Sequence, residues 1–331
     1  MNTKIAIGCL VQWYEVEVID DYLLSLKNSI SEYGIKGDVQ NLYLDFDIYI
    51  GKMLEKPILN KSATQLGNEI YDKIVGLKHY FPNLNINCNI RKDLITISDY
   101  RREFNSFYSG IADVLIWGES DMIAPKELFT SVDMLHSSDS VPSKYIATFA
   151  ITKMWDSSWT PLEHPTVKDK PFIEGDTENW WSVRYTMSIE ELYKINDLET
   201  NLSINEINPI KFNGCGLVIS SEVIKSGVNI PKSVFFVHED TAFMIMLQKI
   251  LPNIKQLHFS NILLAHNRKN PKKRMYILGE DNIDKTDMGA LRKSHPWYTL
   301  ANKMSESNCY NLFDTNYKSY SWEDVFKKLQ N

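Results

Sequence analysis

The sequence predicts an α/β fold, with a Rossmann-like sheet flanked by helices. Short apolar runs typical of buried strands alternate with segments in which apolar residues recur every three or four positions, the pattern of amphipathic helices. The first such pair comprises the run 4–11 and the helical segment 18–30, which Gly34 and Gly37 end. This alternation favours parallel strands joined by right-handed crossovers, with helices on both faces of the sheet.

Further elements continue the pattern along the chain. We expect strands over 38–43, which closes on Asp45, and over 94–98, 114–117, 144–153, 212–220 and 262–265. We expect helices over 68–80, 100–109, 190–198, 221–226, 241–250 and, near the end of the chain, 322–329. The stretch 50–65 contains Pro57 and little periodicity, so we interpret it as an insertion.

Composition limits the class of protein. The 331 residues, 44% hydrophobic and 24% charged, are typical of a soluble globular protein. A net charge of -6 argues against a general polyanion binder, because Lys and Arg supply phosphate affinity. The four cysteines form no CxxC pair, and we interpret them as reduced core thiols. No apolar run approaches the ~20 residues of a membrane span and no signal peptide is evident, so we expect a cytoplasmic protein.

An acidic loop after a buried strand is the strongest functional signal. The apolar run 114–117 leads into Gly118, and Glu119 and Asp121 follow at once. Ligands collect at the carboxyl ends of strands in α/β sheets, and acids two positions apart can converge on one cation. The alternative is a local structural role, in which Asp121 caps the helix that Pro125 begins.

Later segments carry further candidate residues. Gly214 and Gly216 lie in a strand-like run, where they allow another backbone to approach closely. Glu239 and Asp240 precede a helix, where acids are also favoured simply by the helix dipole. His266 ends a late strand, although a lone histidine is more often structural than a metal ligand.

Two stretches each have a purely structural and a functional interpretation. Five basic residues between 268 and 274 fit a solvated loop, but Arg and Lys also clamp pyrophosphate. The stretch 155–185 is dense in aromatic residues, with Trp180 and Trp181 near its end. Such rings suit either a small core or a surface on which sugar rings pack.

The order of these signals resembles that of the GT-A glycosyltransferases, especially the inverting enzymes of family 2. The similar segments are the apolar first strand, the helix 22–30, the Arg-bearing helix 100–105, Glu119-Ser120-Asp121 with the following 122–129, the strand 213–220 and the Glu-Asp pair within 238–241. Two departures stand out: Glu119 replaces the first acid of the family's Asp-x-Asp element, and the Gln-x-x-Arg-Trp ending is absent.

The resemblance implies a mixed GT-A sheet and a metal-assisted transfer with inversion. Asp121, assisted by Glu119, would hold a divalent cation, Mn2+ or Mg2+, that bridges the two phosphates of a nucleotide sugar, and His266 would complete the site. Asp240 resembles the general base that takes the proton of the acceptor hydroxyl, with Glu239 as the substitute for that role.

The resemblance also implies binding roles. A UDP-sugar is the favoured donor, and a carbohydrate or another hydroxyl compound is the acceptor. The implied nucleotide-binding residues are Asp45, Arg101, Arg102, Arg268, Lys273 and Arg274, and the implied acceptor-binding residues are Trp180 and Trp181. We expect a catalytic domain over 1–275, divided into a donor half (1–130) and an acceptor half (131–275), and a C-terminal tether and helix over 276–331.

Three alternatives remain open. A nucleotidyltransferase of related fold needs a glycine-rich loop with a basic residue after the first strand, and residues 8–13 do not supply one. A non-catalytic carbohydrate-binding protein would not need Asp121 and Asp240 to face one cleft. A phage-type enzyme that modifies DNA bases is disfavoured by the acidic net charge and favoured by the basic run 268–274.

Overall fold

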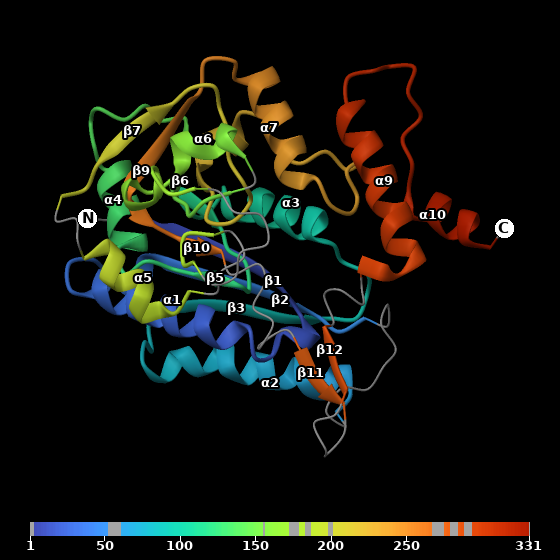
Figure 1. Cartoon of the computed structure of the whole chain (residues 1–331), viewed down its shortest axis with the longest axis horizontal. Coiled ribbons are helices and arrows are strands. Elements are labelled where there is room, and N and C mark those ends of the chain that lie inside the picture. Colours follow the sequence, from blue (N-terminus) through green and yellow to red (C-terminus); the bar gives the residue numbers. More distant parts are fainter. Residues whose placement is uncertain are drawn as a thin grey trace.

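A mixed eight-stranded sheet forms the centre of the molecule (Figure 1). The computed structural model describes residues 3–51, 61–154, 156–171, 179–182, 187–197, 201–266, 275–278, 284–287 and 293–330. The strands are β1 Ile5–Gln12, β2 Leu42–Tyr49, β3 Asn85–Arg91, β4 Val114–Trp117, β6 Tyr145–Ala150, β7 Ile204–Ile207, β8 Val218–Ser220 and β9 Lys255–Leu263. Their order is β3-β2-β1-β4-β8-β6-β9-β7. β8 and β7 run antiparallel to their neighbours, so the predicted mixed sheet is confirmed.

Two short pairs of strands lie outside this sheet. β5 (Met122–Ile123) pairs antiparallel with β10 (Ala265–His266), and β11 (Met275–Leu278) pairs with β12 (Asp284–Asp287). The first pair matters for function, because it places His266 opposite Met122, directly after the acidic loop.

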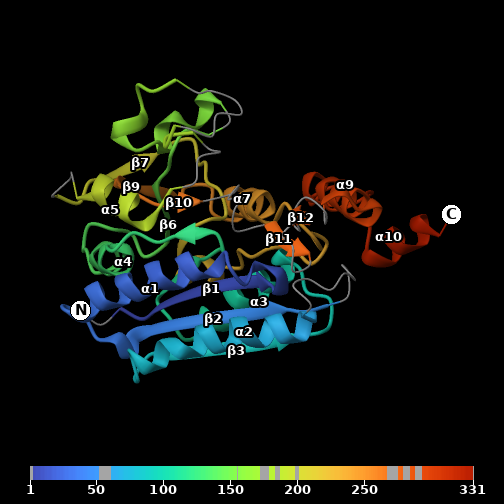
Figure 2. The same ribbon diagram turned by 60° about the horizontal axis from the view of Figure 1, so that its bottom comes forward.

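Helices cover both faces of the sheet, as Figures 1 and 2 show. They are α1 Ile19–Gly34, α2 Ala63–Val75, α3 Ile97–Tyr108, α4 Leu128–His136, α5 Ile189–Asn196, α6 Ser221–Lys225, α7 Glu239–Ile250, α9 Pro296–Tyr310 and α10 Trp322–Leu329. Short 3-10 helices are η1 Trp13–Glu15, η2 Val39–Asn41, η3 Gly76–His79, η4 Ser157–Leu162 and η5 Pro165–Val167.

The alternation of β1 divides the core into two layers. Ile5, Ile7 and Cys9 face the side packed by α1, α2 and α4, whereas Ala6 and Leu10 face the side packed by α3, α6 and α7. Successive side chains of a strand point to opposite faces, so both faces of β1 must be apolar in a sheet covered on both sides. The near-continuous apolar run at the N-terminus therefore correctly predicts a central strand.

The strand expected over 94–98 is wrong. The third parallel strand is β3, and residue 96 instead begins a helix, where Thr96 and Asp99 form a capping box at the start of α3. β3 is an edge strand whose Asn residues are exposed, so it lacks the apolar run that marks the central strands.

The second strand lies further along the chain than its sequence suggests. β2 extends to Tyr49, which places Asp45 and Asp47 inside the strand rather than at its end. Hydrogen-bond donors on β3 and α3 offset the cost of burying these carboxylates, because a buried carboxylate needs donors around it. Asn87 Nδ2 lies 2.6 Å from Asp45 Oδ1, and the hydroxyls of Tyr100 and Tyr108 donate to the same carboxylate.

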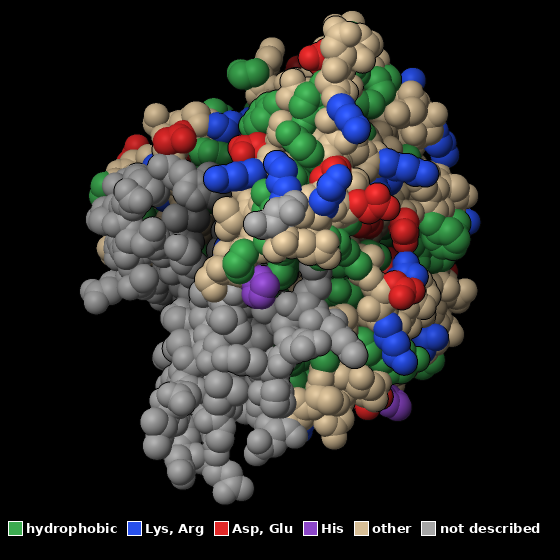
Figure 3. Space-filling model, turned by 90° about the vertical axis from the view of Figure 1, so that its right-hand side faces the viewer, with side chains coloured by type: hydrophobic (Ala, Val, Ile, Leu, Met, Phe, Trp, Pro, Cys, Tyr) green, Lys and Arg blue, Asp and Glu red, His purple; other side chains and the backbone are tan. Residues whose placement is uncertain are grey.

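The C-terminal helices are attached to the main body through aromatic packing. Trp297 of α9 and Trp322 of α10 pack on Phe236, with ring centroids 5.8 and 5.5 Å away. Figure 3 views the molecule from this end, where basic, acidic and hydrophobic side chains are intermixed on the surface.

The division of the chain at residue 275 stays a prediction. Among the described residues, no helix is both long and apolar enough to cross a membrane.

Candidate functional site

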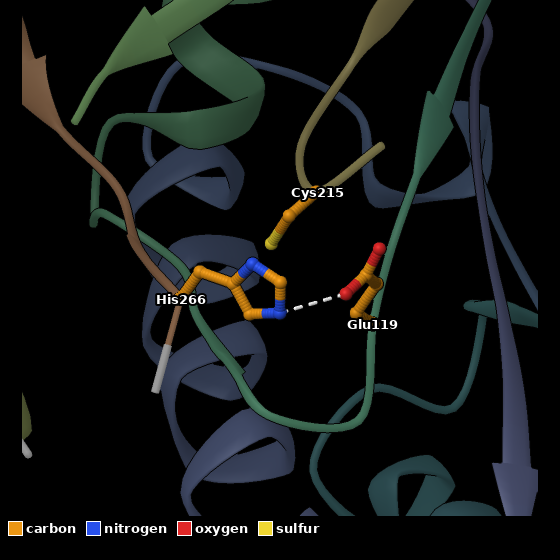
Figure 4. Close-up of side chains that lie close together, drawn as sticks. All are labelled: Glu119, Cys215 and His266. Atoms are coloured by element: carbon orange, nitrogen blue, oxygen red, sulfur yellow. Dashed lines mark ion pairs between the residues drawn. The ribbon is translucent and has the colours of Figure 1, made fainter. Parts of the chain in front are cut away.

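Three side chains with metal-binding chemistry meet beyond the carboxyl end of β4. Glu119 follows β4, His266 ends β10, and Cys215 lies in the loop before β8. One donor atom from each lies within 4.8 Å of the others. Figure 4 shows the imidazole of His266 between the Cys215 thiol and the Glu119 carboxylate. His266 Nε2 lies 2.8 Å from Glu119 Oε2 and 3.2 Å from Asp121 Oδ1.

The acidic loop is held in place by backbone contacts. Gly118 N donates to Gly8 O at 2.7 Å, and Met122 N donates to Glu119 O at 3.0 Å, which closes a turn around Asp121. A side chain at position 118 would collide with the Tyr22 hydroxyl, so glycine permits this close approach of the loop to β1 and α1. The helix cap proposed for Asp121 is wrong, because α4 begins after Glu127 and has no side-chain cap.

A buried arginine joins this loop to the start of α7. Arg101 Nη2 lies 2.7 Å from Glu119 Oε1, and Arg101 Nη1 lies 2.5 Å from Glu239 Oε1. Nη2 also donates to Gly214 O at 3.0 Å, and the guanidinium stacks 4.6 Å from the centre of the Trp117 ring. Only 2% of the Arg101 side chain is exposed, so these contacts form in a low-dielectric environment where charge pairing is strong.

Carboxylates outnumber permanent cations around this arginine. Burial raises the pKa of Glu239 from its ordinary 4.5 to about 7, with Arg101 opposing this and Asp240 adding to it. Burial also disfavours the charged form of Arg101, but Glu239, Glu119 and Asp240 outweigh this, and the net effect raises the pKa of Arg101. The group therefore has an excess of negative charge that a bound cation would relieve.

The donor set fits a divalent cation. Carboxylate oxygen, imidazole nitrogen and thiolate sulfur are all ligands of divalent metals in proteins. Two donors that share one zinc ion lie at most about 4.5 Å apart, because each bond is about 2.0–2.3 Å long. The donor atoms of Glu119, Cys215 and His266 lie within 4.8 Å of one another, which is close to this span, so rotation of these side chains would allow them to share one ion, with Asp121 beside them through its contact with His266.

The predicted acid pair lies at the beginning of α7. Glu239 and Asp240 are its first two residues, and His238 precedes them with a left-handed backbone (φ 70°). Asp240 Oδ1 accepts a hydrogen bond from Thr241 N at 2.7 Å, so Asp240 belongs to the first turn and is not the N-cap. Glu239 is linked to Glu119 through Arg101, which connects the two acidic segments.

Two predicted nucleotide-binding residues are engaged elsewhere in the protein. The Asp45 carboxylate lies within β2, only 7% exposed, where Asn87, Tyr100 and Tyr108 donate to it. All three guanidinium nitrogens of Arg102 have partners, which are Asp99 and the carbonyls of residues 230, 231 and 234. The structure does not bring either residue to the cluster, and nucleotide contact by them stays a prediction.

The remaining predicted residues are only partly described. Trp180 is half-buried against a small core that includes Ile123 and Leu263, and it meets the Trp181 ring edge-on at 6.0 Å. This packing agrees with the core interpretation, and acceptor binding by the two tryptophans stays a prediction. Arg268, Lys273 and Arg274 lie outside the described residues.

Sequence reasoning missed Cys215. We interpreted all four cysteines as core thiols; Cys215 is half-buried against the main core, and its thiol also belongs to the cluster with His266. The one available signal was its place between Gly214 and Gly216, since glycines on both sides of a residue permit close approach of other chain segments. Arg101, which we assigned to the nucleotide, is bonded to protein carboxylates, and nucleotide contact by it stays a prediction.

Comparisons with known proteins confirm the GT-A fold. No protein-family model and no curated protein sequence matches the chain. Among solved structures, the mannosyltransferase PcManGT from Pyrobaculum calidifontis, in complex with GDP-Man and Mn2+, is similar over 99% of this chain and 68% of its own, with a TM-score of 0.50 and 7% identity. TarS of S. aureus (residues 1–349) matches 95% of this chain and 73% of its own, with a TM-score of 0.46 and 11% identity. The chain therefore shares its overall fold with this mannosyltransferase.

We predict that Gly214→Ala displaces Arg101. A methyl group at position 214 would collide with the guanidinium, which cannot move without leaving Glu239 as an unpaired buried charge. We expect the free energy of unfolding to fall by about 1–3 kcal/mol, measured by urea denaturation. Gly76→Ala is the control, because a methyl group at that position meets nothing within 4 Å. Equal stability of the two variants would mean that Arg101 is not fixed as described.

We predict a pH-dependent effect of Glu239→Gln. Burial raises the pKa of Glu239 to about 7, above the 4.5 of the unfolded chain, so wild type loses stability as pH rises from about 4.5 through 7. The glutamine amide would not ionise, so the variant should gain stability relative to wild type over this range. Urea unfolding at pH 4.5, 6 and 7.5 measures the difference. The opposite slope would mean that Arg101 holds Glu239 ionised at low pH.

Proposed function

We propose that this protein is an inverting glycosyltransferase, which moves a sugar from a nucleoside-diphosphate sugar to an acceptor hydroxyl. The observation that carries this proposal is the convergence of Glu119, Asp121 and His266 at the carboxyl edge of the sheet, joined through Arg101 to the acids of α7. In α/β folds this edge is where nucleotide ligands bind. A likeness of fold alone would not assign this function, because one fold hosts many activities.

A divalent cation held by Asp121, Glu119 and His266 would neutralise the charge that develops on a departing diphosphate. The fit rests on the donor set and on the excess of carboxylates described above. The structural neighbour PcManGT, in complex with GDP-Man and Mn2+, supports a site of this kind. It also makes a GDP-sugar a donor to test beside the UDP-sugar that we favour.

The two acids of α7 would have different roles. Glu239 is 2.5 Å from Arg101 and buried, so its carboxylate is occupied in positioning the arginine. Asp240 is the better general base, because its carboxylate accepts hydrogen bonds from the backbone and the hydroxyl of Thr241, whereas the carboxylate of Glu239 is paired with a guanidinium. We propose that Asp240 accepts the proton of the acceptor hydroxyl as that oxygen attacks the anomeric carbon from the face opposite the diphosphate, which inverts the configuration.

The three alternative functions differ in what they require of the structure and in what an experiment would show. β1 continues past Gly8 to Gln12, and a 3-10 helix follows, so the glycine-rich turn that a nucleotidyltransferase needs is not formed there. A non-catalytic carbohydrate-binding protein predicts sugar binding without turnover. The DNA-modifying variant depends on the basic run at 268–274, and duplex binding that falls steeply with salt would support it.

The test is donor hydrolysis and binding with UDP-, GDP- and CMP-sugars, with and without Mn2+. We expect Asp121→Ala to weaken metal-dependent donor binding, measured by calorimetry. Asp240→Asn should leave that binding intact and lower turnover by about 10²–10⁴-fold, the usual contribution of a general base. Asp72→Ala, on the exposed side of α2, is the control and should change neither quantity.

Unchanged turnover in both Asp121→Ala and Asp240→Asn would contradict the proposal. Tight sugar binding by wild type with no turnover of any donor would favour the carbohydrate-binding alternative instead.

A further inference from the structure

We propose that Cys215 is a direct ligand of the cation, which makes this a mixed sulfur, nitrogen and oxygen site that favours thiophilic ions such as Zn2+ and Co2+ over Mg2+. The inference deepens the proposed function, because it rests on the same cation site. Its geometric basis is the single cluster in which donor atoms of Glu119, Cys215 and His266 lie within 4.8 Å of one another (Figure 4).

The backbone of Cys215 is fixed on both sides. Its own N–H donates to Asn213 Oδ1 at 3.0 Å, and Gly216 N donates to Trp117 O at 2.8 Å. The preceding carbonyl, that of Gly214, accepts a hydrogen bond from Arg101. These three hydrogen bonds therefore fix the backbone of the loop that carries the thiol. A metal site requires its ligands to be held in place before the ion binds.

Close packing brings this loop against the strand that carries His266. Gly216 has φ +73°, and a Cβ built on it would lie 2.5 Å from Leu264 Cδ1. Leu264 is two residues before His266, so the missing side chain at position 216 permits the approach that places the thiol beside the imidazole. Glycine at position 216 therefore permits the arrangement, which depends on the packing of this loop against Leu264.

The chemistry of sulfur decides which ion such a site prefers. Thiolate is a soft ligand that selects Zn2+ and similar ions, whereas Mg2+ requires oxygen ligands in near-octahedral geometry. Most sites bind Zn2+ more tightly than Mn2+ whatever their ligands, so a Zn2+ preference alone does not reveal the sulfur. The informative quantity is the change in the ratio of Zn2+ to Mg2+ affinity when the sulfur is removed.

The experiment is a metal titration of the metal-free full chain, without nucleotide or acceptor. For wild type we expect a sulfur-to-Co2+ charge-transfer absorption band on addition of Co2+. Cys215→Ser should lose the band and weaken Zn2+ binding by more than about 10- to 100-fold, which is the usual cost of removing only an outer-shell partner of a ligand, while Mg2+ binding changes little. Cys88→Ser is the matched control, because Cys88 is also half-buried but lies on β3 away from the cluster, and it should keep the band.

A second measurement does not depend on a variant that folds. Zn2+ should protect Cys215 of wild type from iodoacetamide, with the modified peptide located by mass spectrometry, and Mg2+ at the same concentration should not. A band that persists in Cys215→Ser, or Zn2+ binding without protection of Cys215, would overturn the inference while leaving the glycosyltransferase proposal intact. Failure of wild type to bind any divalent cation would overturn both.

Discussion

The charge of one buried guanidinium constrains the whole candidate site. Arg101 stands between Glu119, from the loop after β4, and Glu239, from the start of α7, and it lies on the face of Trp117. Removing one member of a buried ion pair typically costs about 3–5 kcal/mol, because the partner charge is left unpaired. The relative position of the two acidic segments is therefore fixed before any ligand binds.

The carboxylates around Arg101 give the site a surplus of negative charge. Such a surplus is better explained by a role in binding than by a contribution to stability. Burial raises the pKa of Glu239 towards neutrality against the opposing effect of Arg101, and the nearby carboxylates of Asp240 and Glu119 add to the rise. Perturbed groups of this kind gather at functional sites. The same crowding gives a divalent cation an electrostatic reason to bind between Glu119, Asp121 and His266.

The sequence predicted those parts of the molecule that depend on local pattern. The apolar run of β1, the amphipathic α1 and the acidic loop at Glu119 are visible in the order of residues. The sequence did not predict β3, because the exposed Asn residues of this edge strand interrupt the apolar run that marks a buried strand. The different roles of the adjacent Arg101 and Arg102, and the proximity of Cys215 to His266, depend on packing between segments far apart in the chain, such as Gly216 against Leu264. No local pattern encodes these contacts.

The most direct test of this account is a crystal structure of the protein with Mn2+ and either UDP or GDP, with the metal located by its anomalous scattering. The account predicts an anomalous peak within bonding distance of Asp121, Glu119 and His266, in contact with the diphosphate. An ordered nucleotide bound elsewhere, or a peak remote from these three side chains, would contradict it.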